Sequence, residues 1–372
     1  MCSVSLVGEP IVRAMFPVLL VCFAWLSACV PHPSSIPPLT CATQSDAASA
    51  DLLFVSFRRP VCGAGGMQLS DWRHEPGAFG YRNEQARGGA SHGTDFLVEE
   101  TAWWDRLGKQ VGEASGRPPV VLIHGFNNSH NDAMRRGAAL RFLHLSKRPV
   151  VVISWPSFSK FYLYTWAEAN DDWASEPIKK FLSELTRRYP GTDLVAHSMG
   201  SRILANALLA PSGTDLRPGK IIMAAPDIDR QLVQAILRRD TGFGLPVVIY
   251  ASRADQVMSA SWRVHGNPRA GDLSTYIKGR VRLSPLPEVR NAVILDTTDV
   301  RGSWEGHRDI LNSPEAAADV CRVLEDQPVG PGRKPVTGAA NYWDLVAASE
   351  PDPCALRNPA NPRDTKRASS YK

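Results

Sequence analysis

One serine stands between an apolar segment and a helical segment in residues 193–202, which read Asp-Leu-Val-Ala-His-Ser-Met-Gly-Ser-Arg. Residues 194–196 form a short apolar run typical of a central parallel strand, and apolar residues recur at helical spacing from residue 203. A tight strand-to-helix turn would expose the Ser198 hydroxyl and needs small residues two positions away, here Ala196 and Gly200. The pattern predicts a nucleophilic serine, although a pentapeptide this degenerate cannot establish one alone.

A second apolar run, residues 120–123, leads directly into His124-Gly125-Phe126. A serine that attacks a carbonyl needs N–H donors for the negative oxygen of the tetrahedral intermediate. We expect the backbone N–H groups of Phe126 and Met199 to supply them, with Gly125 allowing a close approach. The alternative is a plain turn at the end of a strand.

An acid and a histidine follow the serine in the chain. The predicted strand 247–250 is followed by Asp255, and the predicted strand 292–295 by a loop that contains His307. Parallel strands deliver their following loops to one edge of a sheet. We therefore expect Ser198 to attack, His307 to carry the proton, and Asp255 to orient the imidazole ring.

Other residues compete for these roles. Asp227 and Asp229 follow the strand predicted at 221–224 and either supply the acid or cap the next helix, which we favour. His265 precedes the last predicted strand, so we expect a surface or loop residue there. His197 is expected to be buried or to form part of the pocket wall, not to act as the base.

These segments together resemble one family. The residues that carry the resemblance are Leu122-Ile123-His124-Gly125-Phe126-Asn127, Ile153-Ser154-Trp155-Pro156, Ala196-His197-Ser198-Met199-Gly200, Ala225-Pro226-Asp227-Ile228 and Tyr250-Ala251-Ser252-Arg253-Ala254-Asp255. The chain resembles the bacterial α/β-hydrolase family DUF900, which is akin to esterases and lipases, over residues 51–326. The resemblance implies the fold and the nucleophile and says little about substrate.

The N-terminus has the pattern of a lipoprotein signal peptide. Residues 14–26 are uncharged and mostly apolar, which is too short for a membrane span and suits a signal peptide. They lead into Leu-Ser-Ala-Cys, so we expect cleavage after residue 28 and acylation of Cys29, which would anchor the chain to a membrane. An ordinary cleaved signal is the alternative. Because Val30 follows the cysteine, we expect the outer membrane of a bacterial envelope, on its periplasmic side or surface.

The rest of the chain divides into three parts. Residues 29–50 are rich in Pro and Ser and predict a tether, residues 51–326 a single catalytic domain, and residues 327–372 a mostly disordered tail. Apolar runs alternate with helical segments such as 131–145 and 178–188, which predicts an α/β fold with a doubly wound, mostly parallel sheet. The net charge of +5 is modest, and we expect no nucleic-acid partner.

Four cysteines lie outside the signal peptide and the acylated position: Cys41, Cys62, Cys321 and Cys354. In an oxidising compartment they permit two disulfides with three possible connectivities, or some remain buried thiols. None has the spacing of a metal site, and we expect no cofactor.

Six aromatic residues gather just after the predicted strand 150–154: Trp155, Phe158, Phe161, Tyr162, Tyr164 and Trp166. They predict either an apolar pocket wall or packing of a helix on the sheet. The function that we expect is cleavage of small-molecule or lipid carboxylic esters. Acyl transfer or thioester cleavage by the same three residues is an alternative, and so is a non-catalytic envelope lipoprotein that retains the fold.

Overall fold

The computed structural model describes residues 52–63, 66–85, 92–142, 148–158, 160–209, 216–238, 247–277, 280–283, 292–300, 306–307, 312–337, 341–347 and 354. The expected signal peptide, the tether and Cys29 lie outside these residues. Among the helices described, none is both long enough and apolar enough to span a membrane.

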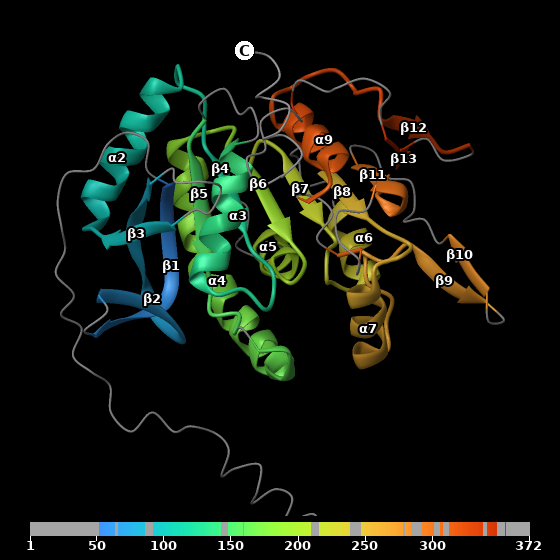
Figure 1. The fold of residues 1–372 in the computed structure, drawn as a ribbon, viewed down its shortest axis with the longest axis horizontal. Helices are drawn as coiled ribbons and strands as arrows, with labels where there is room; N and C mark the ends of the chain where they lie inside the picture. The colour runs from blue at the N-terminus through green and yellow to red at the C-terminus, as the bar shows by residue number, and fades with distance from the viewer. Residues whose placement is uncertain are drawn as a thin grey trace, which may run out of the picture. The chain divides into compact units, whose positions relative to one another are not determined.

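Strands and helices alternate along most of the chain (Figure 1). The strands are β1 (Leu52–Gly63), β2 (Gly66–Gln85), β3 (His92–Leu97), β4 (Val120–Ile123), β5 (Val150–Ser154), β6 (Asp193–His197), β7 (Ile221–Ala224), β8 (Val247–Ala251), β9 (Ser274–Ile277), β10 (Arg280–Leu283), β11 (Ala292–Asp296), β12 (Arg333–Pro335) and β13 (Tyr342–Leu345). The helices are α2 (Glu100–Glu113), α3 (His130–Phe142), α4 (Tyr164–Arg188), α5 (Gly200–Leu209), α6 (Arg230–Arg238), α7 (Gln256–His265) and α9 (Pro314–Leu324), with short 3₁₀ helices η1 (Phe161–Leu163) and η3 (Thr298–Val300).

One mostly parallel sheet organises these elements, as the sequence predicts. Its strand order is β12-β13-β11-β8-β7-β6-β4-β5-β1-β2-β3. Every neighbouring pair from β13 to β1 is parallel, and antiparallel pairs occur only at the two ends of this sheet. β9 and β10 form a separate antiparallel pair.

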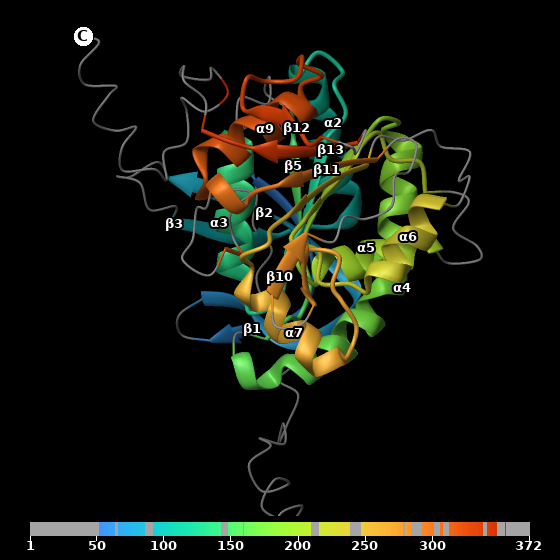
Figure 2. The same ribbon diagram turned by 90° about the vertical axis from the view of Figure 1, so that its right-hand side faces the viewer.

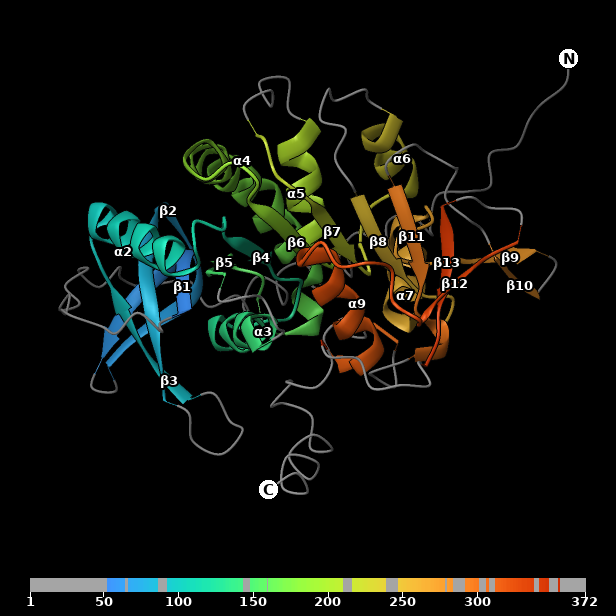
Figure 3. The same ribbon diagram turned by 90° about the horizontal axis from the view of Figure 1, so that it is seen from above.

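Helices cover both faces of the sheet. Figure 3 shows α4, α5 and α6 on one side and α3 and α9 on the other. The alternation of side chains along a strand separates the two cores. In β4, Val121 and Ile123 pack into the core that contains α2, α4, α5 and α6, whereas Val120 and Leu122 pack into the core that contains α3 and α9.

The order of the central strands determines where a ligand can bind. The chain leaves β4 for β5 on one side and then returns to β6 on the other side of β4. At such a reversal the connections diverge and leave a crevice at the carboxyl ends of the strands. The residues that follow β4 and β6 at this crevice are the expected oxyanion loop and Ser198.

Two segments, β2 and α4, differ from the sequence-based expectation. β2 was not expected, because its sequence contains Pro76 and three glycines and lacks alternation; antiparallel pairing with β1 and β3 defines it. Helix α4 begins at Tyr164, not near residue 178. Pro177, which is typical of a helix start, lies in its interior.

The expected disordered tail is also wrong in part, because β12 and β13 lie within residues 327–372 and join the sheet. β13 pairs in parallel with β11 (Figure 2), and its Tyr342 and Leu345 are buried. A four-residue strand between Gly- and Pro-rich segments is too short to show periodicity, so pairing and burial define it.

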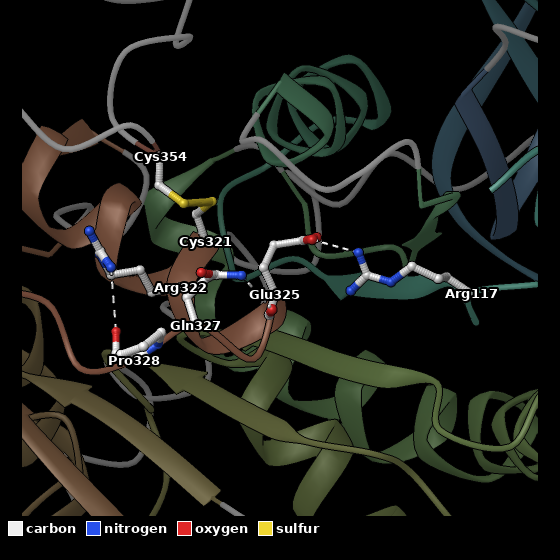
Figure 4. The surroundings of a disulfide bond; sticks show 7 residues. All are labelled: Arg117, Cys321, Arg322, Glu325, Gln327, Pro328 and Cys354. Atoms are coloured by element: carbon white, nitrogen blue, oxygen red, sulfur yellow. Dashed lines mark hydrogen bonds and ion pairs between the residues drawn. A yellow bond between two sulfur atoms is a disulfide. The ribbon is translucent and has the colours of Figure 1, made fainter. Parts of the chain in front are cut away.

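A disulfide links Cys321 of α9 to Cys354 beyond β13, with a Cα–Cα distance of 5.8 Å (Figure 4). Near it, Glu325 at the end of α9 forms an ion pair with Arg117 (2.5 Å), which precedes β4. Cys62 is also disulfide-bonded, and Cys41 lies outside the described residues. The C-terminal segment is therefore covalently attached to the helix that follows the His307 loop.

Candidate active site

Ser198 occupies the turn between β6 and α5. Its φ of +52° lies in the left-handed region, which is uncommon for a residue other than glycine. Strand β7 and the segment that follows it hold this backbone: Ser198 N donates to Ala224 O (2.9 Å), and Ser198 O accepts from Asp227 N (3.2 Å). The sheet thus stabilises a strained conformation that presents the hydroxyl at the crevice.

Two glycines permit this turn to lie against the loop after β4. A Cβ atom on Gly200 would lie 2.5 Å from the carbonyl oxygens of both Ile123 and His124. A Cβ atom on Gly125 would lie 2.8 Å from Ser198 Cβ. Both contacts are too short for real Cβ atoms, so the close approach of loop and serine requires glycine at both positions.

The structure brings Ser198, His307 and Asp255 into one hydrogen-bonded chain. The distance from Ser198 Oγ to His307 Nε2 is 3.0 Å, and that from His307 Nδ1 to Asp255 Oδ2 is 2.8 Å. All three side chains are buried, and they come from the ends of β6 and β8 and from the segment after β11. These are the three residues that the chain order predicts.

The imidazole of His307 has one consistent protonation pattern. The Asp255 carboxylate can only accept, so Nδ1 donates to it, and in the neutral ring Nε2 accepts from the Ser198 hydroxyl. Burial lowers the pKa of His307, but the carboxylates of Asp255 and, to a lesser extent, Asp227 raise it, so that the pKa lies above the ordinary 6.5. The ring is therefore placed to accept the proton of Ser198.

Asp227 lies in the same pocket with different partners, and our expectation that it caps a helix is wrong. Its carboxylate accepts from Arg269 Nε (2.7 Å), Ser261 Oγ (2.6 Å) and Tyr164 Oη (2.7 Å). It therefore ties α4 to α7 and does not contact the His307 ring. Asp229 does cap α6, through Gln231 N (2.7 Å).

His197 and His265, the two other histidines weighed as the base, have structural contacts. His197 is buried, lines the pocket, and contacts the backbone oxygen of His307 through Nε2 (3.1 Å), as expected of a wall residue. His265 lies in the last turn of α7 and not in a loop. It contacts Glu168 (2.7 Å) and packs edge-on against Tyr164.

A cavity of about 520 Å³ opens beside the serine and the histidine. Phe126, expected to donate to the oxyanion, lines it, and Met199 lies between Ser198 and the first residue of α5. The remaining wall residues come from the loop after β4, from α3, from the end of β6, from the segment after β7 and from the segments around α4 and α7. They are Asn127, Asn128, Arg136, Tyr162, Tyr164, Thr165, His197, Asp227, Gln256, Val257, Ala260, Ser261 and Val264.

The aromatic segment after β5 divides between the two expected roles. Tyr162 and Tyr164 line the cavity, and Tyr162 is 78% exposed at its mouth. Trp155 is fully buried and stacks on His124, so it supports the loop. Trp166 packs against Phe158.

A second Ser–His–Asp arrangement lies between the edge strands and α3, and sequence reasoning missed it. Ser154 Oγ is 2.9 Å from His130 Nδ1, and His130 Nε2 is 3.4 Å from Asp95 Oδ2. Arg58 donates to Ser154 Oγ (3.1 Å), and Arg82 donates twice to Asp95. None of these residues lines the cavity. Their contacts join β1, β2 and β3 to β5 and α3.

Within the described ranges, no group of three or more His, Cys, Asp or Glu side chains is arranged to hold a metal ion. The site consists of a hydroxyl, an imidazole, carboxylates and backbone N–H groups. This donor set matches acyl transfer by a serine nucleophile.

Comparison with known proteins identifies a family. A search of curated proteins finds no match. The crystal structure of lipase B from Aspergillus fumigatus is similar, with 16% sequence identity and a TM-score of 0.33; the match covers 58% of this chain and 54% of the lipase chain, so it spans about half of that protein. The family model described as "Alpha/beta hydrolase of unknown function (DUF900)" matches residues 99–322. Because this match covers more than half of the 372 residues, the chain belongs to the DUF900 family of α/β hydrolases.

Proposed function

We propose that this chain is a serine hydrolase that cleaves carboxylic esters. The observation that carries the proposal is the unbroken hydrogen-bonded chain from Ser198 through His307 to Asp255 at the wall of the cavity. Packing alone does not require three residues that are far apart in the sequence to form a hydrogen-bonded chain in the order serine, histidine, aspartate. Their meeting at the crevice of the sheet supports a catalytic role.

In this mechanism, His307 Nε2 takes the proton from Ser198 as Oγ attacks the ester carbonyl carbon. The carbonyl oxygen becomes negative and accepts hydrogen bonds from the backbone N–H groups of Phe126 and Met199. Collapse of the intermediate breaks the bond to the alcohol oxygen, to which His307 returns the proton. A water molecule then repeats the sequence on the acyl-enzyme and releases the acid and the free serine.

The cavity walls favour an ester with an apolar part. Tyr162, Tyr164, Val257 and Val264 line the cavity, and Val264 is 66% exposed. The Asp227 carboxylate is paired with Arg269, so it contributes little net negative charge. An alkyl or aromatic group of the substrate would cover these side chains and remove them from water.

We also propose that the chain is anchored to a bacterial envelope membrane through acylated Cys29. The support is the apolar segment 14–26 followed by Leu-Ser-Ala-Cys. Growth with an alkyne fatty acid would label the wild type, whereas Cys29→Ser would abolish labelling and leave the chain in the soluble fraction. Equal labelling of both would refute the anchor.

A fluorophosphonate probe, which reacts with activated serines, tests the proposed function on the full chain. We expect labelling and turnover of p-nitrophenyl esters by the wild type and neither by Ser198→Ala. Ser201→Ala is the matched control, because Ser201 is buried three residues away and its hydroxyl bonds Ala196 O. Absence of labelling in a folded wild type would overturn the proposal, as would equal labelling of Ser198→Ala.

A further inference from the structure

Asn128 lies at the end of the loop after β4 and its side chain binds that loop. Its Nδ2 donates to Gly125 O (3.0 Å) and to Phe126 O (2.7 Å), while its Oδ1 accepts from Arg136 Nε (2.8 Å). The partners fix the orientation of the amide, because two carbonyls need a donor and a guanidinium needs an acceptor. The residue is 3% exposed.

The two carbonyls that Asn128 binds belong to two consecutive peptide groups. Gly125 O and the N–H of Phe126 are parts of the same planar trans peptide, so they point in opposite directions. Holding this carbonyl therefore fixes the direction of the N–H that we expect to face the oxyanion. The same applies to Phe126 O and the N–H of Asn127.

His124 is a second partner of Gly125 O, at 2.8 Å from its Nδ1. Its Nε2 accepts from the backbone N–H of Trp155 (3.2 Å), so the proton of the neutral ring resides on Nδ1, which donates to Gly125 O. Burial and then the nearby Arg58 guanidinium hold the pKa of His124 well below its usual range. The ring is therefore neutral at neutral pH, and its two hydrogen-bond partners fix the tautomer.

Asn128 is itself held from β1. Its backbone oxygen accepts from Arg58 Nη2 (2.6 Å) and from Ser157 Oγ (2.8 Å). Arg58 is fully buried and lies outside the segment that matches the family model. The loop is therefore also held by a side chain of β1, a strand that the sequence motifs do not include.

We infer that Asn128, assisted by His124, is the positioning residue that directs the Phe126 N–H at the oxygen that becomes negative during the reaction. The inference rests on the proposed function. It goes beyond that function by assigning a role to a side chain that transfers no proton and forms no bond to the reacting carbon. Asn128 would stabilise the transition state by fixing the direction of the peptide dipole that contains the Phe126 N–H.

The test compares Asn128→Asp and Asn128→Ala with Asn170→Asp on the full chain, using p-nitrophenyl butyrate. Asn170 is a matched control: its Nδ2 also donates to a backbone carbonyl (Pro156 O, 2.7 Å), its Oδ1 accepts from Arg73 Nε (2.6 Å), and it does not line the cavity. We expect kcat of the Asn128 variants to fall about 10-fold to 100-fold, with KM changed less than about 3-fold, because a lost oxyanion donor costs about 10²-fold or more.

A trifluoromethyl ketone and the matching trifluoromethyl alcohol distinguish positioning from damage to the pocket. The ketone forms a negatively charged adduct with the serine, whereas the alcohol binds without reacting. We expect the Asn128 variants to lose ketone affinity in step with kcat/KM and to keep alcohol affinity. Asn128→Asp preserves the side-chain volume and carries the test should Asn128→Ala melt below the assay temperature.

Two results would overturn the inference: Asn128 variants that behave like Asn170→Asp, or equal losses of ketone and alcohol affinity. A failure of the proposed function is separate, because the wild type would then neither react with the fluorophosphonate nor form the ketone adduct.

Discussion

Asp255 holds His307 with one carboxylate oxygen and begins helix α7 with the other. Oδ2 is 2.8 Å from His307 Nδ1, while Oδ1 accepts the N–H of Met258 (2.9 Å) as the cap of α7. The cap fixes the side chain in the conformation that the histidine needs. Because Val257 and Val264 of the same helix line the cavity, one residue aligns both the base and the substrate wall.

The first prediction concerns pH. His307 accepts a proton only when neutral; burial lowers its pKa, but the carboxylates of Asp255 and then Asp227 raise it above 6.5. We therefore expect kcat/KM to fall as the pH decreases through a midpoint above 6.5. Asp255→Asn removes the larger of the two effects that raise this pKa and leaves burial in place. The midpoint should therefore move to lower pH, and kcat should fall by about 10³-fold to 10⁴-fold.

The control for this prediction is Asp229→Asn, which makes the same carboxylate-to-amide change at the start of α6, where either side chain accepts the N–H of Gln231. Its pH profile should match that of the wild type. A midpoint that is the same in Asp255→Asn and the wild type would show that another group controls the ionisation of His307.

The second prediction concerns Gly200. A Cβ atom there would lie 2.5 Å from two backbone oxygens, neither of which can move without displacing β4 or the loop after it. We expect Gly200→Ala to lower the free energy of unfolding by about 2 kcal/mol or more and to abolish fluorophosphonate labelling. Denaturant unfolding and labelling measure the two effects.

Gly112→Ala is the opposite case and the control. Gly112 lies inside α2, and a Cβ atom there meets nothing within 4 Å. Alanine should stabilise the helix by about 0.5–1 kcal/mol and leave labelling unchanged. If Gly200→Ala and Gly112→Ala had the same free energy of unfolding, the close contact of Gly200 with the two carbonyl oxygens would not restrict the residue at this position.

The site was predictable where local pattern determines it. The run at 194–196, the small residues around Ser198 and the strand ends before Asp255 and His307 are visible in the sequence because each depends on neighbours in the chain. Asn128, Arg58 and the partners of Asp227 were not predictable, since their roles come from contacts between elements far apart in the sequence. No periodicity reports such contacts.

The same distinction applies to the fold. The central strands are buried on both faces and read as continuous apolar runs, so their order of appearance was clear. β2 and β13 lie toward the two ends of the sheet, where polar residues and prolines are tolerated and pairing alone defines a strand.

The third prediction concerns substrate length. Tyr162 lines the cavity mouth and is 78% exposed, so Tyr162→Ser should leave the melting temperature nearly unchanged. Only an acyl or alcohol chain that reaches the mouth would lose contact with the ring. We expect KM for p-nitrophenyl octanoate to rise about 3-fold to 10-fold and KM for the acetate to change little. Equal effects on both esters would show that the acyl chain of the octanoate does not reach Tyr162.

The last prediction concerns the disulfide between Cys321 and Cys354. It closes a loop with a sequence separation of 33 residues, for which chain entropy predicts a stabilisation of about 3–4 kcal/mol. A reducing agent is an ambiguous probe because Cys62 is also disulfide-bonded.

Cys354→Ser removes only the bond to Cys321, and it leaves the buried Cys321 side chain in place, so no cavity forms in α9. We expect Cys354→Ser to unfold at lower denaturant concentration than the wild type and, while folded, to retain fluorophosphonate labelling, since neither cysteine lines the cavity. If wild type and variant unfolded at the same concentration without reductant, the C-terminal attachment would contribute nothing to stability, and the packing of β13 against β11 would be sufficient to hold it.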